Sequence, residues 1–166
     1  MVTVTTVSTP VRTEGHEDTE RACKQAAAQL ASIVEMVEWL THARECSRLS
    51  GCAEGCTGGD GYANAEEYHD EEAAREFLTD APLSAEVRTD WHAVGAVEAA
   101  KPTHYKILLC WGGPAVQMVG TLDDYNQPDS AELQCQDWCT EWTRFPTTRK
   151  DEADLIAYAT EFYFDE

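Results

Sequence analysis

HYKILLCWGGPAVQMVGTL, residues 104–122, is the stretch of sequence that decides the fold. Two apolar runs, 107–111 and 115–119, lie on either side of Gly112-Gly113-Pro114, whose residue types favour a turn. The pattern predicts an antiparallel hairpin at the centre of the core. Because the first run is apolar at consecutive rather than alternate positions, we expect both faces of this strand to be covered, by helices on both sides or by another protein surface.

Helical periodicity is found on both sides of the hairpin. Between about Thr19 and Gly51, apolar residues recur at steps of three or four, which predicts a long amphipathic helix. A second, strongly acidic helix is predicted over residues 64–79. Thr148 with Asp151 three residues later resembles a capping box, which predicts a last helix burying Leu155, Ile156 and Ala159.

Further strands complete the expected sheet. Residues 83–88 alternate between apolar and polar types, and residues 131–138 follow the hairpin as the next strand of a meander. The sequence therefore predicts an α+β fold, with an antiparallel sheet of about four strands packed against two to three helices. Residues 1–16 are expected to be a tail or an edge strand, and residues 17–166 a single domain.

The charge is strongly negative. The chain has 31 Asp and Glu against 12 Lys and Arg, a net charge of −19, at 43% hydrophobic residues. The acids are spread evenly, with 16 in residues 1–83 and 15 in residues 84–166. The folded body should therefore have a negative field, which disfavours nucleic acid and anionic membrane and favours a basic protein partner. Solubility alone is the other interpretation of the same charge.

The N-terminus and the number of cysteines indicate the cellular compartment. The start of the chain has neither the charged beginning nor the apolar run of a signal peptide, and no apolar run reaches the length of a membrane span. Seven cysteines, an odd number, suit a reducing compartment better than a disulfide framework. We expect a soluble cytoplasmic protein.

Two groups of cysteines are close in sequence, namely Cys46, Cys52 and Cys56 around a glycine-rich loop, and Cys135 with Cys139. Thiolates of the first group could form a tetrahedral zinc site with His42 or His69. Neither group contains the C-x-x-C spacing that brings two thiolates together on one turn. We therefore predict no metal site.

Cys110 with His104 or His92 could form a nucleophilic pair. Cys110, however, lies in the apolar strand, where a thiol is ordinarily an inert core residue. Among so many carboxylates, no acid and base can be singled out as a catalytic pair. We predict no catalytic residue and no cofactor.

The acidic surface is the remaining candidate site. Carboxylates of the second helix and of the loop after the hairpin could imitate the phosphates of a nucleic acid and occupy a cationic groove. Trp111, Trp138 and Trp142 are expected near the hairpin; core packing is the ordinary role of such residues, and an interface anchor is the alternative. The predicted partner-binding residues are Glu66, Glu67, Asp70, Glu71, Glu72, Glu76, Asp123, Asp124, Asp129 and Trp111.

Four separate segments carry a resemblance to a known group of proteins: REFLTDAPLSAEVRTDWH, YKILLCWGGPAVQMVGTLDDYNQP, LQCQDWCTEWTRF and YATEFYF. Together they span about residues 75–164, and they resemble a family of small uncharacterised proteins of bacterial phages, plasmids and integrative conjugative elements. The resemblance implies an accessory role in a bacterial host cell. Such elements often encode small acidic anti-restriction or anti-CRISPR proteins.

Two hypotheses for the function follow. The first is a non-enzymatic inhibitor that binds a basic, nucleic-acid-binding surface of a host defence complex, most specifically a CRISPR surveillance complex, and blocks DNA access. The second is a small regulatory or structural interaction protein of the mobile element, which could form a homodimer through the Leu30–Leu40 part of the first helix.

Overall fold

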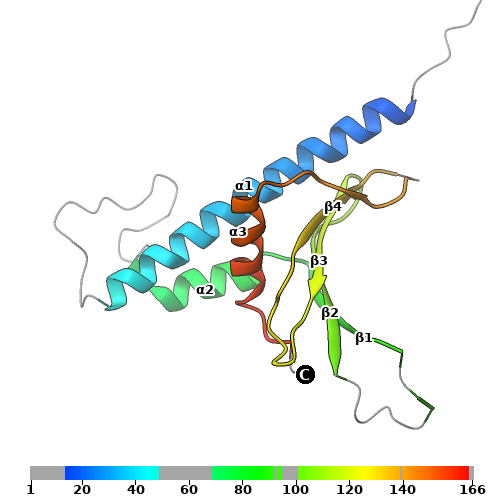
Figure 1. Cartoon of the computed structure of the whole chain (residues 1–166). Helices are drawn as coiled ribbons and strands as arrows, with labels where there is room; N and C mark the ends of the chain where they lie inside the picture. The colour runs from blue at the N-terminus through cyan, green and yellow to red at the C-terminus, as the bar shows by residue number, and fades with distance from the viewer. Residues whose placement is uncertain (1–13, 49–68, 92, 95–100, 139, 165–166) are drawn as a thin grey trace, which may run out of the picture.

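The computed structural model describes residues 14–48, 69–91, 93–94, 101–138 and 140–164, with side chains from residue 19 onward. Helices and a sheet form two layers (Figure 1). The helices are α1 (Glu14–Arg48), α2 (Glu71–Asp80) and α3 (Arg149–Ala159). The strands are β1 (Ser84–Thr89), β2 (Pro102–Cys110), β3 (Ala115–Thr121), β4 (Glu132–Gln136) and β5 (Thr143–Arg144). The predicted α+β class is confirmed, with five strands in place of about four.

The sheet is an antiparallel meander in the order β1-β2-β3-β4-β5. The predicted hairpin is confirmed as β2 and β3, joined by a turn in which Gly112 and Gly113 have φ values of 125° and 77°. These are left-handed conformations that glycine adopts without steric cost. Across the sheet, Ile107 lies opposite Met118, and Met118 lies opposite Leu133, so one face has a continuous apolar band.

In the described part of the chain, the helices cover one face of the hairpin, so the predicted cover by helices on both sides is wrong. Along β2 the side chains alternate, with Tyr105, Ile107 and Leu109 buried and their neighbours only partly so. The opposite face of the sheet is an open groove of about 610 Å³. A β-bulge shifts the register between Leu108 and Cys110, and Cys110 packs against the core although it directly follows the buried Leu109.

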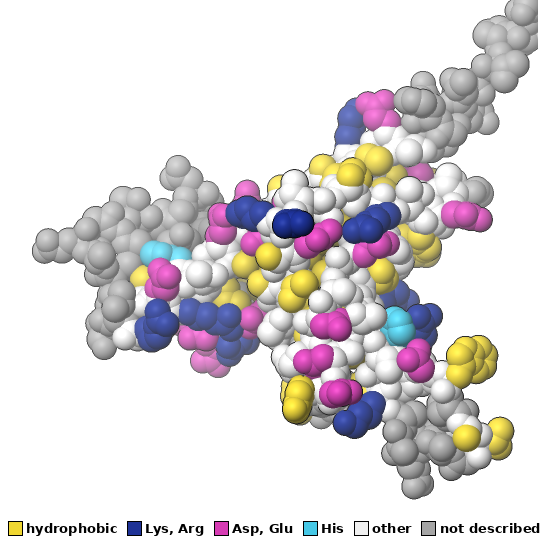
Figure 2. All heavy atoms as spheres, viewed as in Figure 1, with side chains coloured by type: hydrophobic (Ala, Val, Ile, Leu, Met, Phe, Trp, Pro, Cys, Tyr) yellow, Lys and Arg dark blue, Asp and Glu magenta, His cyan; other side chains and the backbone are white. Residues whose placement is uncertain are grey.

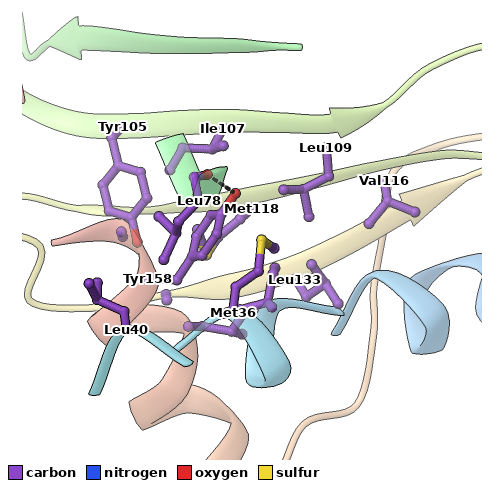
Figure 3. Packing of buried hydrophobic residues seen from close by; sticks show 14 of the residues in the cluster. Met36, Leu40, Leu78, Tyr105, Ile107, Leu109, Val116, Met118, Leu133 and Tyr158 are labelled. Carbon is purple, nitrogen blue, oxygen red and sulfur yellow. Dashed lines mark hydrogen bonds between the residues drawn. The ribbon is translucent and has the colours of Figure 1, made fainter. Parts of the chain in front are cut away.

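The core lies between the apolar face of the sheet and the three helices. Figure 3 shows Met36 and Leu40 of α1, Leu78 of α2 and Tyr158 of α3 directed toward strand residues such as Ile107, Met118 and Leu133. The Tyr158 hydroxyl donates a hydrogen bond of 3.3 Å to the Leu78 carbonyl oxygen, which links α3 to α2. Burial raises the pKa of this hydroxyl.

The apolar stripe of α1 is used inside the chain. Ile33 and Leu40 are in the core, and Leu30 and Val37 pack against it. This is the stripe on which the homodimer was predicted, so a second copy would need another surface.

Two helix starts follow from capping. The predicted capping box is confirmed, since Thr148 and Asp151 exchange hydrogen bonds at the start of α3. Helix α2 begins at Glu71, within the predicted 64–79 helix. The Asp70 side chain caps it by accepting hydrogen bonds from the backbone N–H groups of Glu72 and Ala73. Residues 64–68 lie outside the described residues.

Candidate functional site: exposed carboxylates and a tryptophan ledge

The acidic helix α2 is held in place by a ring of ion pairs. One member of the ring is Glu71, which was predicted to contact a partner. Glu71 lies 3.2 Å from Arg44 of α1 and 3.1 Å from Arg75, and Glu161, just after α3, lies 2.8 Å and 3.2 Å from the same two arginines. The hydrogen bond from Arg44 to Glu161 is the main cause that raises the pKa of Arg44. Glu71 is therefore a structural residue whose charge is balanced.

A row of carboxylates is left on the outer side of α2. Glu72, Glu76 and Asp80 are spaced four residues apart and are all exposed. This spacing places them one above another, about 6 Å apart along the helix axis. Within the described part of the chain, no Lys or Arg forms an ion pair with these three residues. Of the remaining predicted residues on this segment, Asp70 is the helix cap, and Glu66 and Glu67 lie outside the described residues.

The loop between β3 and β4, residues 122–131, uses its carboxylates differently. Asp123 accepts hydrogen bonds from the backbone N–H groups of Tyr125 and Gln127, at 2.8 and 2.9 Å. Asp129 accepts a hydrogen bond from the Thr121 hydroxyl. Both side chains shape the loop, although both are exposed, and Asp124 is exposed beside them. Figure 2 shows acidic and basic side chains interspersed over the visible face, with no single acidic patch.

Trp111 and Trp138 are exposed, so the prediction that these tryptophans pack in the core is wrong. Their exposed fractions are 68% and 66%, and Trp142 is half-buried. A small pocket of about 100 Å³ is lined by both indoles together with Gly112, Gly113, Ala115, Gln136 and Asp137. We call Trp111 and Trp138 the tryptophan ledge. Exposed aromatic pairs of this kind are typical of interface anchors.

The ledge is fixed by close packing and by a buried carboxylate. A Cβ atom at Gly113 would lie 2.1 Å from the Trp138 ring nitrogen, so only glycine allows the turn to approach the indole this closely. Asp137, 2% exposed, accepts hydrogen bonds from Nε and Nη2 of Arg21 at 2.8 and 3.0 Å, and from the backbone N–H of Trp138 at 2.7 Å. The Arg21 contact holds the pKa of Asp137 below its usual value. Asp137 thus links Trp138 to α1, through a contact with Arg21 that spans 116 residues of sequence.

The open face of the sheet is polar and of mixed charge. Lys106 pairs with Glu86 at 2.9 Å, and Arg144 pairs with Glu132 at 3.4 Å. Because Arg88 and Lys106 line this groove together with Glu86 and Glu132, it does not present a single sign of charge.

Cys110 and His104, considered above as a nucleophilic pair, do not come together. Cys110 lies near the Gln25 amide at 3.7 Å, whereas His104, six residues earlier on the same strand, is about 20 Å away at the rise of a β-strand. Burial, with a contribution from Cys23, raises the pKa of Cys135 to about 11, which keeps that thiol protonated and unreactive at neutral pH. His92 lies outside the described residues.

Three potential metal ligands do come together at the far end of α1. His42 and Cys46, one turn apart on α1, meet His69, which lies just before the α2 cap. Cys52 and Cys56, the other cysteines of the predicted zinc alternative, lie outside the described residues.

Comparison of the chain with protein-family models, with curated proteins and with solved structures finds no match. Among the described residues, no helix combines the length and the apolar character that a membrane span requires.

Proposed function

We propose that this chain is a non-enzymatic binding protein that occupies a cationic, nucleic-acid-binding surface of another protein and so blocks access of nucleic acid. The observation that supports the proposal most is the exposed row of Glu72, Glu76 and Asp80 on α2, in a chain of net charge −19. Regularly spaced carboxylates can satisfy basic side chains that otherwise contact phosphates. The proposal refines the predicted contact by adding Asp80 and removing Glu71, whose charge is balanced.

The way in which α2 is held favours this role. Its inner side is fixed by Leu78, which is fully buried, and by the ion-pair ring with Arg44 and Glu161. A contact surface that is already ordered loses little conformational entropy on binding. The tryptophan ledge supplies an apolar anchor, since charge gives association rate and specificity more than affinity.

The partner is proposed more narrowly from the resemblance of residues 75–164 to proteins of mobile elements. Such an element gains from an inhibitor of a host defence complex, and a CRISPR surveillance complex is the specific candidate. The protein would then act in the cytoplasm of a bacterial host.

The partner is tested by affinity capture from bacterial lysate, followed by mass spectrometry and a DNA-binding assay of the captured complex. We expect a nucleic-acid-handling defence complex as the main capture, with DNA binding reduced when the chain is present. Capture that is unchanged between low and high salt would contradict the proposal, because exposed charge pairs are screened.

A second candidate function is a regulatory or structural interaction protein whose charge serves solubility. The observation that favours it is the tryptophan ledge, which can dock on an apolar surface without a cationic partner. Substitution of Trp111 and Trp138 by Ala separates the two functions. Wild-type binding that does not change with salt and is lost in this variant supports the second, whereas wild-type binding that weakens as salt rises supports the first.

A further inference from the structure

The cluster of His42, Cys46 and His69 contains none of the residues of the proposed binding surface. His42 and Cys46 lie four residues apart on α1, so both side chains point from the same side of the helix. His69 is brought to them by the packing of α2 against α1. Cys46 is buried, and both histidines are partly buried.

The distances within this cluster match those of ligands around one metal ion. His42 Nε2 and His69 Nδ1 lie 3.3 Å apart, and Cys46 Sγ lies 3.4 Å from the first nitrogen and 3.5 Å from the second. In tetrahedral geometry, Zn–N bonds of about 2.0–2.1 Å place two nitrogens about 3.3–3.4 Å apart. A Zn–S bond of about 2.3 Å places sulfur and nitrogen about 3.6 Å apart.

We propose that His42, Cys46 and His69 bind one Zn²⁺ ion. Imidazole nitrogen and thiolate sulfur are the ligand types that zinc prefers, and zinc accepts tetrahedral geometry without an electronic penalty. Three protein ligands leave a fourth position for water or a further donor.

The ion would connect two elements that the sequence separates. It ties the last turns of α1 to the residue before the α2 cap, beside the ion-pair contact of Arg44 with Glu71. Because the unfolded chain does not hold these ligands together, the binding free energy stabilises the folded state. The site is structural in this respect, and it fixes the helix that presents Glu72, Glu76 and Asp80.

The test uses the full chain, purified without chelator or added metal and then loaded with Zn²⁺ or Co²⁺. Elemental analysis is expected to give about one equivalent of zinc, and Zn²⁺ is expected to raise the Tm, as for any ligand that binds only the folded state. X-ray absorption at the zinc edge of the wild-type protein should show two imidazoles and at least one sulfur. Co²⁺ should give tetrahedral visible bands and a sulfur-to-cobalt charge-transfer band.

Variants identify the ligands. Cys46→Ser, His42→Gln and His69→Gln are each expected to weaken zinc binding by more than about 100-fold, because changes behind the ligands alone cost 10–100-fold. The matched controls Cys110→Ser and His104→Gln change the same residue types away from the cluster and should bind zinc as the wild type does.

The readouts on the wild-type chain do not depend on the folding of a variant. Absence of bound zinc after loading, a zinc site without imidazole or without sulfur, or full zinc affinity in all three ligand variants would overturn the proposal. None of these readouts depends on partner binding, so failure of the zinc site and failure of the proposed function are distinguishable.

Discussion

Helix α2 and the β3–β4 loop are both acidic, but they use their carboxylates in opposite ways. In the loop, Asp123 and Asp129 accept hydrogen bonds from the chain itself and set its shape. On α2, Glu71 has a structural role, while Glu72, Glu76 and Asp80 stay on the exposed side. The number of acidic residues in a segment therefore does not give the number of carboxylates that are available to a partner. Availability depends on which backbone groups and arginines lie nearby.

The largest expected effect tests whether α2 is held by its inner side. Leu78→Ala should lower the free energy of unfolding by about 2–5 kcal/mol, because it opens a cavity at a fully buried position. Leu83→Ala is the matched control, since Leu83 is 62% exposed and should cost less than about 0.5 kcal/mol. Urea unfolding measures both. Equal losses for the two variants would mean that α2 is not anchored in the core as described.

Asp137 is a buried carboxylate whose oxygens are both hydrogen-bonded to Arg21, so it represents the opposite case to the exposed acids of α2. Because Arg21 lowers its pKa in the folded state, the pair adds stability above the unfolded pKa of about 3.9. That stability is lost as the pH falls through the lower, folded pKa. Asp137→Asn should therefore be less stable than the wild type at pH 6, with a difference that shrinks below about pH 4.

Urea unfolding of both proteins between pH 3 and pH 6 measures this difference. Asp124→Asn is the control, since Asp124 is exposed and its substitution should give no such pH dependence. A stability difference between wild type and Asp137→Asn that is constant over this range would contradict the role given to Arg21.

A smaller effect separates two neighbouring acids of the loop. Asp123→Ala removes the acceptor of two backbone hydrogen bonds and should cost about 1 kcal/mol of stability. Asp124→Ala, at an exposed position next to it, should change stability by less than about 0.5 kcal/mol. Thermal unfolding of the two variants gives the comparison. A loss at Asp124 equal to that at Asp123 would remove the distinction between structural and available carboxylates.

The hairpin and the start of α3 were predicted correctly because each is determined by residues close together in the sequence. The Gly112-Gly113-Pro114 turn located the hairpin, and the Thr148–Asp151 capping box located the start of α3. The two-residue strand β5 was missed because Thr143 and Arg144 are too few to form a period. The start of α2 was placed too early because the prediction included Asp70 in the acidic helix, although Asp is favoured at the cap.

The candidate site was predicted only in part, because its charges are decided by contacts between distant segments. Nothing near Glu71 in the sequence indicates Arg44 as a partner, and Glu161 completes the ring from the far end of the chain. Cys46, His42 and His69 were all named as candidate zinc ligands from the sequence, but the lack of a C-x-x-C spacing led to the prediction of no metal site. The spacing of His42 and Cys46 by one helical turn was the available signal, whereas the approach of His69 to them depends on the fold.

The most direct test of the central claim compares two double charge reversals against the captured partner. Glu76→Lys with Asp80→Lys alters the α2 row, and Glu45→Lys with Glu141→Lys makes the same change of net charge at exposed positions elsewhere. We predict that the first pair weakens binding by at least about 10-fold at low salt, or 1.4 kcal/mol, while the second changes it little. Equal affinities for the two variants would show that net charge, and not the row on α2, governs the interaction.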